Sequence, residues 1–197
     1  MKRFLTPVIL LLFSTLFLAA QEQSATVITG ARLIDGRGGR PVDNATVIIR
    51  GNRIESVNVG GNAAIPDGAT VIDAMGRCLL PGYIDAHFHM NYPDFSDVRP
   101  MLNEAICAYR SVPYLYNHLM GGITTLFDAG GYHNTTLMAR KAWREGYITG
   151  SRPVVSGERI NGTGGHGVSR FDMAVEVDGP DQFRKAVRGA DMPVPTW

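Results

Sequence analysis

Cysteine is scarce in this sequence, with two residues, Cys78 and Cys107, among 197. Two cysteines cannot supply the disulfide framework that stabilises small secreted folds. One bond between them and two small buried side chains are both compatible with the sequence. An excess of one charge is also lacking, because 19 basic residues face 18 acidic residues and leave a formal net charge of +1. This balance excludes the basic surface that nucleic acid requires, so we expect no nucleic-acid partner.

Long apolar runs are limited to one, at residues 4–18. Two basic residues precede this run, and Ala19 and Ala20 follow it. The layout predicts a signal peptide over residues 1–20 that is cleaved after Ala20. The alternative is an uncleaved membrane anchor, for which the run is short. No second run is apolar enough to span a membrane, so we expect a periplasmic or secreted protein with no membrane association after cleavage.

Residues 21–78 are rich in short stretches with the composition of β-strands. These stretches lie at residues 26–29, 31–34, 45–50, 53–57 and 69–73. Gly51 and Asn52 form a tight hairpin turn between two of them. Several short strands at close spacing predict a small β-sandwich-like domain. Its aspartates stand at turn positions, so we assign it no catalytic role.

Beyond residue 78 the pattern changes to strands that alternate with helices. We expect strands at residues 79–85, 123–128 and 153–156, and helices at residues 111–120, 135–145 and 181–188. This alternation predicts βα units and a parallel sheet. Three units are visible, and we expect no further strand after them.

The first of these strands runs into Asp85, His87 and His89. Side chains two positions apart in a strand share a face, so the two histidines are predicted to project together from its C-terminal end, with Asp85 facing the same way. Active sites of α/β barrels are built at that end of the strands. Two imidazoles on one rigid strand make half of a divalent-metal site suited to Zn²⁺. A lone His-x-His pair is weak support, because such pairs also occur by chance.

Residues 80–89, LPGYIDAHFH, resemble the first-strand signature of the amidohydrolase superfamily. The strands upstream are similar to the small N-terminal β-domain of that family. Residues 122–128 resemble its second barrel strand. Residues 159–167, RINGTGGHG, resemble a third-strand loop of the imidazolonepropionase-like and prolidase-like branch. The resemblance covers nearly all of residues 26–190.

This resemblance implies an α/β fold in which the small β-domain is followed by the first three βα units of an incomplete TIM (β/α)8 barrel, over residues 79–190. It implies one or two divalent metal ions, with zinc the expected element. Such ions polarise the scissile carbonyl and activate water to attack it. The expected function is that of an exported amidohydrolase acting on a C–N bond in a cyclic amide, an amide or a dipeptide.

The resemblance also assigns roles to residues. His87 and His89 are the expected metal ligands, and His166 is the expected substrate-side group. Asp85 and Asp128 are candidates for orienting a metal ligand. Their alternative role is ordinary hydrogen bonding, at a strand end for Asp85 and in a turn for Asp128. No residue of this chain is predicted to be a catalytic acid or base.

The remaining ligands of the family lie on later strands, as a carboxylated lysine, two histidines and an aspartate. The only lysines after His89 are Lys141 and Lys185, and both fall in predicted helices. A barrel of eight units needs about 250 residues. Residues 191–197 contain two prolines and are expected to form an aberrant or disordered tail.

From these departures we expect a truncated chain that is poorly stable and inactive alone. Open sheet edges and exposed apolar faces would favour its aggregation. The alternative to an enzyme is a non-catalytic remnant, or a half-enzyme that needs a separately encoded C-terminal part. The expected binding partner is a small amide or dipeptide substrate. Association of the chain with further copies of itself is also compatible with the sequence.

Overall fold

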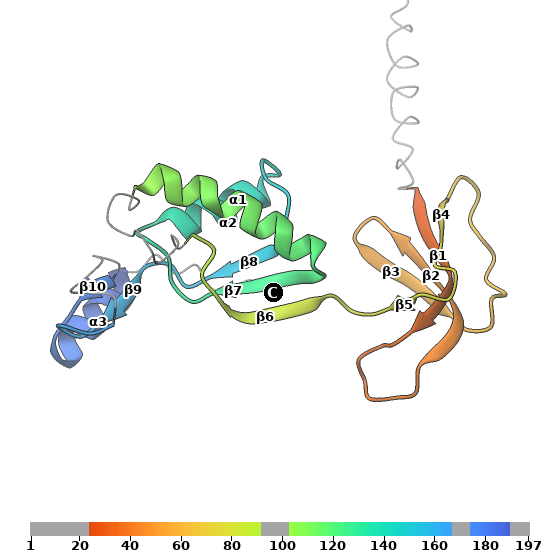
Figure 1. Ribbon diagram of the computed structural model, residues 1–197, viewed down its shortest axis with the longest axis horizontal. Coiled ribbons are helices and arrows are strands. Elements are labelled where there is room, and N and C mark those ends of the chain that lie inside the picture. The colour runs from red at the N-terminus through yellow and green to blue at the C-terminus, as the bar shows by residue number, and fades with distance from the viewer. Residues whose placement is uncertain (1–23, 92–102, 167–173, 190–197) are drawn as a thin grey trace, which may run out of the picture. The chain divides into compact units, whose positions relative to one another are not determined.

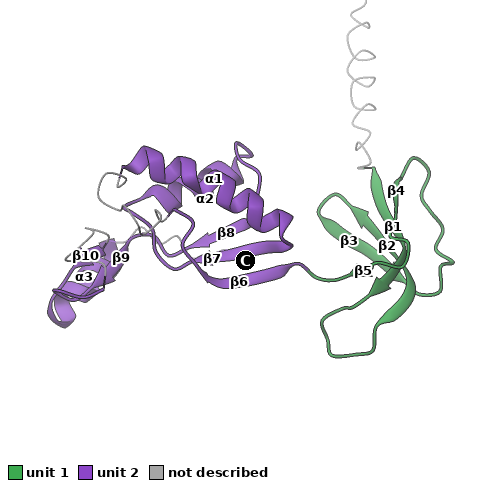
Figure 2. Cartoon of the chain, viewed as in Figure 1, with its two compact units in different colours: residues 1–81 green, residues 82–197 purple. Residues whose placement is uncertain are grey.

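The computed structural model describes three stretches of the chain, residues 24–91, 103–166 and 174–189. They form two compact units, of which unit 1 ends at Pro81 and unit 2 begins at Gly82 (Figure 2). The predicted signal peptide at residues 1–20 and the predicted tail at residues 191–197 lie outside the described residues. Among the helices of the described stretches, none is both long enough and apolar enough to cross a membrane.

Unit 1 contains one five-stranded sheet. Its strands are β1 (Ala25–Leu33), β2 (Val42–Arg50), β3 (Arg53–Asn58), β4 (Thr70–Asp73) and β5 (Cys78–Leu79). The order is β3-β2-β1-β4, and β5 also pairs with β1. Strand β2 pairs with one edge of β1, and β4 and β5 both pair with the other edge. All five strands therefore belong to one sheet. The two stacked sheets of the predicted sandwich-like domain are therefore not found among residues 24–81.

The core of unit 1 is small and lies on β1 and β2. Ala25, Val27 and Ile48 are buried together, with Ala69 packed against them. Outer strands contribute little to this core, since Ile54 of β3 is 68% exposed. Burial stabilises a sheet in proportion to the apolar area removed from water, so unit 1 alone has little apolar stabilisation.

The predicted strand at residues 79–85 is divided between the two units. Leu79 ends β5 and pairs with Leu33 of β1, whereas β6 (Tyr83–Phe88) belongs to unit 2. Pro81 lies between them and has no backbone N–H to donate to a sheet. The units therefore divide after Pro81 rather than after residue 78, where the sequence pattern changes.

Unit 2 is built on three parallel strands in the order β6, β7 (Ile123–Asp128) and β8 (Arg152–Val155). Helix α1 (Glu104–Met120) lies between β6 and β7 in the chain, and α2 (Thr135–Arg144) lies between β7 and β8. Both helices cover the same face of the sheet (Figure 1). The core between them contains Met90, Leu115, Leu126, Ala139 and Val155. The predicted alternation of parallel strands and helices is confirmed here.

The other face of this sheet carries exposed apolar side chains. Phe127 alternates with the buried Leu126 along β7 and remains 39% exposed. Ile84 of β6, which pairs with Thr125, is 70% exposed. Within the described residues, β6 and β8 are also unpaired on their outer sides. Such edges and faces favour association with other chains.

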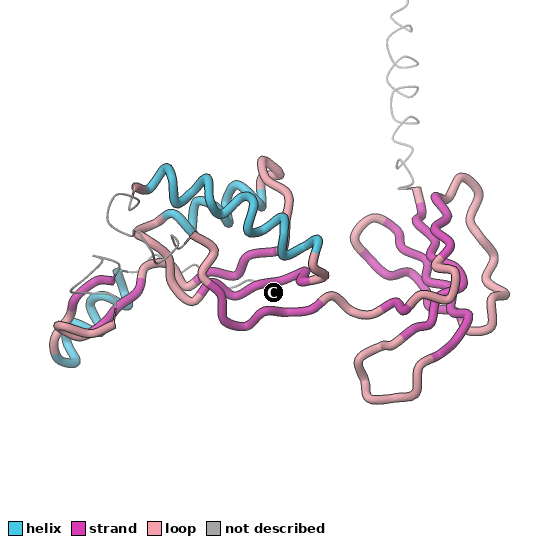
Figure 3. The backbone as a smooth tube through the Cα atoms, in the orientation of Figure 1, coloured by secondary structure: helices cyan, strands magenta, loops and turns pink. Residues whose placement is uncertain are grey.

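Two short strands follow β8 that sequence analysis does not predict. Strands β9 (Arg159–Asn161) and β10 (Ala174–Glu176) pair in parallel with each other and do not extend the β6-β7-β8 sheet. Each has three residues, which is too few to show a periodic pattern. Helix α3 (Gly179–Gly189) comes next and includes the predicted helix at residues 181–188 (Figure 3).

The two cysteines differ in accessibility and are both free thiols, Cys78 exposed and Cys107 buried. Burial raises the pKa of the Cys107 thiol, and the nearby Arg110 charge only partly opposes this. A raised pKa leaves less of the reactive thiolate at neutral pH. We therefore expect iodoacetamide to alkylate Cys107 at least about tenfold more slowly than Cys78. Peptide mass spectrometry after a timed pulse measures both rates, with urea-unfolded chain as the control. Equal rates in the folded chain would contradict the burial of Cys107.

Candidate metal centre

Strand β6 carries one extra residue just before it reaches its end. The register pairs Asp85 with Leu126 and Phe88 with Asp128, so β6 has two residues where β7 has one. A bulge of this kind bends the strand and re-aims its side chains. Strict alternation from Asp85 to His89, which the sequence predicts, is therefore interrupted.

The two histidines, of which His87 lies in the bulge and His89 follows β6, point away from the helices. Phe88, which separates them, packs against the core and lies edge-on to Tyr114 of α1, with ring centres 6.1 Å apart. Neighbouring side chains of an extended segment point to the opposite face, so His87 and His89 project over the uncovered face of the sheet. Their ring centres are 5.3 Å apart and their planes make an angle of 88°. The imidazoles thus lie together, as their spacing predicts, while their role as ligands stays a prediction.

This geometry fits a divalent cation. In a tetrahedral zinc site with Zn–N bonds of about 2.0–2.1 Å, the ring centres of two imidazole ligands lie about 5 Å apart. The ring of His89 is also oriented as metal-binding imidazoles usually are, because its Nδ1 lies 2.9 Å from the carbonyl oxygen of Gly130. A carbonyl only accepts hydrogen bonds, so Nδ1 carries the proton. Nε2 of His89 is then the nitrogen whose lone pair would bind the cation.

Asp128 is fully buried at the end of β7. Its Oδ2 accepts a hydrogen bond from the backbone N–H of Met90 at 2.8 Å, and its Oδ1 accepts one from the N–H of Gly130 at 3.1 Å. Burial raises the pKa of this carboxyl, against the opposing effects of those two N–H groups and of the His89 and Arg159 charges. The bond from Gly130 is the turn contact that the sequence left open as the alternative for Asp128, and the second oxygen bonds to the backbone N–H that follows His89.

Asp85 also bonds to backbone. Its Oδ1 accepts a hydrogen bond from the N–H of His87 at 3.0 Å. Within the described residues, no hydrogen bond joins the Asp85 carboxyl to either imidazole ring. The bulge explains this contact, since the extra residue removes the backbone of β6 from its usual partner on β7. This is the strand-end hydrogen bond that the sequence left open as the alternative, and a role of Asp85 in orienting a metal ligand stays a prediction.

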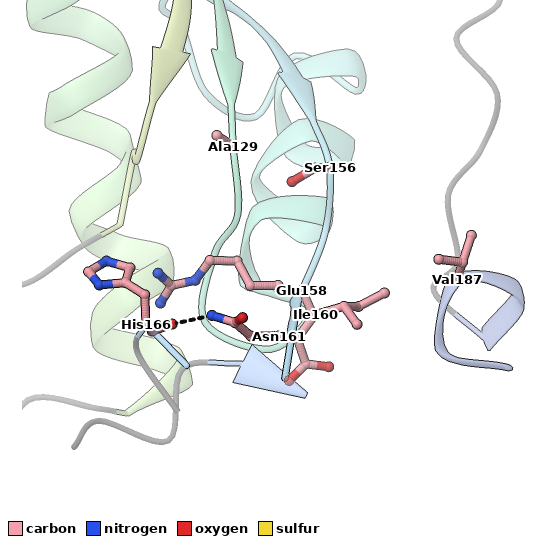
Figure 4. A pocket seen from close by; sticks show the side chains of 8 residues that line it. Ala129, Ser156, Glu158, Ile160, Asn161, His166 and Val187 are labelled. Carbon is pink, nitrogen blue, oxygen red and sulfur yellow. Dashed lines mark hydrogen bonds between the residues drawn. The ribbon is translucent and has the colours of Figure 1, made fainter. Parts of the chain in front are cut away.

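His166 lines a cavity of about 370 Å³ beyond the ends of β7 and β8 (Figure 4). Ala129, Ser156, Glu158, Arg159, Ile160, Asn161 and Val187 complete its lining. A turn returns the chain to this cavity, because Gly165 N–H donates to the Gly162 carbonyl at 2.8 Å. Nδ2 of Asn161 then donates to the backbone carbonyl of His166 at 2.8 Å. The structure thus holds His166 at the strand ends, and His87 and His89 are not among the residues that line this cavity.

The chain is similar to several enzymes in sequence. It is 44% identical over 70 residues to an N-acyl-D-aspartate deacylase of Alcaligenes xylosoxydans xylosoxydans, a match that covers 36% of the chain and 13% of the enzyme. It is 30% identical over 158 residues to a dihydroorotase of Leifsonia xyli subsp. xyli, covering 77% of the chain and 33% of that enzyme. No family model matches the chain.

Solved structures agree with these matches. A prolidase crystallised with N-methylphosphonate-L-proline superposes with a TM-score of 0.75 at 29% identity, covering 85% of the chain and 44% of the prolidase. An Xaa-Pro dipeptidase with bound methionine gives a TM-score of 0.73 at 26% identity, covering 84% of the chain and 44% of the dipeptidase. The chain belongs to the amidohydrolase superfamily. Among its branches, the prolidase-like one is supported.

This amidohydrolase chain spans between 13% and 33% of the length of the deacylase and dihydroorotases it matches. Across the described residues, no three histidine, cysteine, aspartate or glutamate side chains come together as a cluster that could hold an ion. Two imidazoles without further protein donors bind a cation weakly, because structural and catalytic zinc sites use three or four protein ligands.

Gly130 is a residue of the candidate site that sequence reasoning missed, and Arg159 was only a weak candidate there. Gly130 supplies the carbonyl that orients His89, and a Cβ at this position would lie 2.1 Å from Cγ of Arg159. Arg159, a weak candidate from its motif alone, therefore packs against the turn that holds His89. The pair Gly130-Gly131, one residue after the end of the second strand, was the available signal, since glycine permits such close approach.

Proposed function

We propose that this chain contributes the β6 metal ligands to the active site of an exported, zinc-dependent hydrolase that cleaves a C–N bond in a small amide or dipeptide. The observation that supports the proposal most directly is the pair of imidazoles, 5.3 Å apart, at the C-terminal end of the first parallel strand. Barrel enzymes build their active sites at this end of their strands.

Some of the residues present would bind the cation or the substrate, and others would orient the residues that bind. His87 and His89 would hold the cation, and the Gly130 carbonyl keeps the proton of His89 on Nδ1. A divalent cation held there supplies polarisation of a substrate carbonyl and activation of water. His166, whose loop is fixed by Asn161, would offer a hydrogen bond to the substrate from the neighbouring cavity.

The substrate class rests on the similar enzymes. The solved relatives include a prolidase and an Xaa-Pro dipeptidase, whereas the sequence relatives include dihydroorotases and a deacylase. The names of these enzymes share hydrolysis of a C–N bond in a small molecule. We therefore propose Xaa-Pro dipeptides, N-acyl amino acids and dihydroorotate as the first substrates to test.

The test separates metal binding from turnover. Chelator-treated chain is titrated with Zn²⁺ by calorimetry, and the loaded chain is then assayed on the three substrate types. We expect binding that depends on both histidines. Failure to bind Zn²⁺ would contradict the proposed metal site, and turnover that persists in a His87→Ala, His89→Ala variant would contradict its role in the reaction.

A second candidate is favoured by the absence of a three-ligand cluster from the described residues. In this case the chain is a half-enzyme completed by a separately encoded C-terminal part, or a non-catalytic remnant. Zinc binding without turnover on any of the three substrates supports this candidate. Co-expression with the C-terminal half of a related amidohydrolase then separates its two forms, since only a half-enzyme gains activity.

We also propose that residues 1–20 direct export and are removed. The basic start, the apolar run and the small residues before Gln21 support this proposal. N-terminal sequencing of protein recovered from the periplasm or the medium should begin at Gln21. Protein that starts at Met1 and stays with the membrane would instead support the uncleaved anchor.

A further inference from the structure

We propose that Asp128 is a positioning residue for His89, which it fixes through the backbone N–H that follows the histidine and through the turn whose carbonyl bonds to the imidazole ring. This inference rests on the proposed function, because it assigns a purpose to the geometry of a metal ligand. It concerns how the amidohydrolase chain holds the ring, and Asp128 itself would touch neither the cation nor the substrate.

Among the described residues, three hydrogen bonds hold the His89 ring and the backbone beside it, and two of them depend on Asp128. Before the histidine, the carbonyl of Phe88 accepts a hydrogen bond from Ala129 N–H at 2.9 Å. After it, the N–H of Met90 donates to Oδ2 of Asp128 at 2.8 Å. The ring itself bonds to the carbonyl of Gly130, whose own N–H donates to Oδ1 of Asp128 at 3.1 Å. One carboxylate therefore connects the backbone of the ligand with the turn that orients the ligand's ring.

A turn cap alone would not need this arrangement. Capping the turn after β7 requires only the oxygen that accepts from Gly130, yet the second oxygen of Asp128 reaches across to β6. The side chain is 0% exposed, and burying a carboxylate is costly unless hydrogen bonds compensate for the lost water. Asp85 offers a contrast, because it remains partly exposed and, among the described residues, its carboxyl bonds only to the backbone of His87. The buried carboxylate of Asp128 therefore lies where its two hydrogen bonds can fix the orientation of the His89 imidazole.

Two substitutions test this role in the full chain. Asp128→Ala removes both acceptors, whereas Asp128→Asn keeps the shape and one acceptor oxygen and is the variant more certain to fold. Ser111→Ala is the matched control, because Ser111 is also buried and hydrogen-bonded, to Ala108 O at 2.6 Å, but lies in α1. Far-UV circular dichroism identifies the variants that fold. Nitrogen-15 NMR of the histidine rings in metal-free chain, with His89 assigned from a His89→Gln spectrum, reports the tautomer, and competition titration reports the Zn²⁺ affinity.

In the parent chain we expect the His89 ring predominantly as the Nδ1–H tautomer. Asp128→Ala should mix the two tautomers and lower the Zn²⁺ affinity by about 10–100-fold, the usual effect of losing a group that orients a metal ligand. Asp128→Asn should show the same changes to a smaller extent, and Ser111→Ala should show neither.

A folded Asp128→Asn or Asp128→Ala chain with parental tautomer and parental affinity would overturn the inference. Equal changes in Ser111→Ala would also overturn it, because they would reflect general loosening of unit 2. If the parent chain binds no Zn²⁺, the proposed function fails. The ring spectra still decide the role of Asp128 in that case, because they are recorded without metal.

Discussion

Alanine at both His87 and His89 is expected to lower the affinity of the chain for Zn²⁺ by at least about 100-fold, the upper end of the loss caused by removing a supporting partner. The reason is that the described residues bring no third histidine, cysteine, aspartate or glutamate to this site. Without the two imidazoles, the described residues leave no clustered ligands at this site. Competition titration against a chromophoric chelator measures the change.

A His118→Ala variant is the control for this experiment. The His118 ring also lies beside Phe88, with ring centres 4.2 Å apart, but its Nδ1 bonds to the Tyr114 carbonyl of α1. This variant loses an imidazole of unit 2 without touching the proposed site, so its Zn²⁺ affinity should equal that of the parent. A similar loss of affinity in both variants would mean that zinc binds to surface histidines in general.

Replacing Gly150 by alanine is expected to destabilise unit 2 by about 1–3 kcal/mol, the usual cost of overpacking. A Cβ at this position would lie 2.5 Å from the carbonyl carbon of Leu115 and 2.8 Å from its oxygen. Those atoms belong to the backbone of α1, which cannot rotate away as a flexible side chain can. The same segment is fixed by the N–H of Ser151, which donates to the Leu115 carbonyl at 3.0 Å. Thermal unfolding followed by circular dichroism measures the effect.

Gly189→Ala provides the comparison for this prediction. A Cβ at Gly189, the last residue of α3, would have no atom within 4 Å. We expect its effect on the free energy of unfolding to stay within about 0.5 kcal/mol, as for most surface substitutions. Equal midpoints for the Gly150 and Gly189 variants would show that α1 does not approach the entry to β8 as closely as described.

Local patterns predicted the βα units of unit 2 but placed one helix start wrongly. The helix expected at residues 111–120 begins at Glu104, where Asn103 accepts hydrogen bonds from the N–H groups of Ala105 and Ile106. Pro113 explains the error, because proline is normally tolerated only in the first turn of a helix. A start near residue 111 satisfies that rule, whereas the actual helix carries Pro113 in its interior. Cys107 and Leu115, on either side of Pro113 in this helix, are buried, and burial of apolar side chains stabilises a helix.

In the candidate site too, the sequence predicted the features that depend on neighbouring residues and missed those that depend on contacts between distant segments. The spacing of His87 and His89 sufficed to predict that their rings lie together, because both stand on one extended segment. The bulge beside them arises from pairing with β7 and leaves no trace in the sequence of β6. For the same reason, the sequence indicated a turn contact for Asp128 but not its hydrogen bond to backbone that is 38 residues away in the chain.

X-ray absorption at the zinc edge of the Zn²⁺-loaded chain tests most directly whether the imidazoles of His87 and His89 coordinate one cation. Our account predicts two imidazole nitrogens at about 2.0–2.1 Å from the metal, and their scattering should vanish when both histidines are replaced by alanine. A spectrum without imidazole scattering, or one that stays the same in the double variant, would contradict the account.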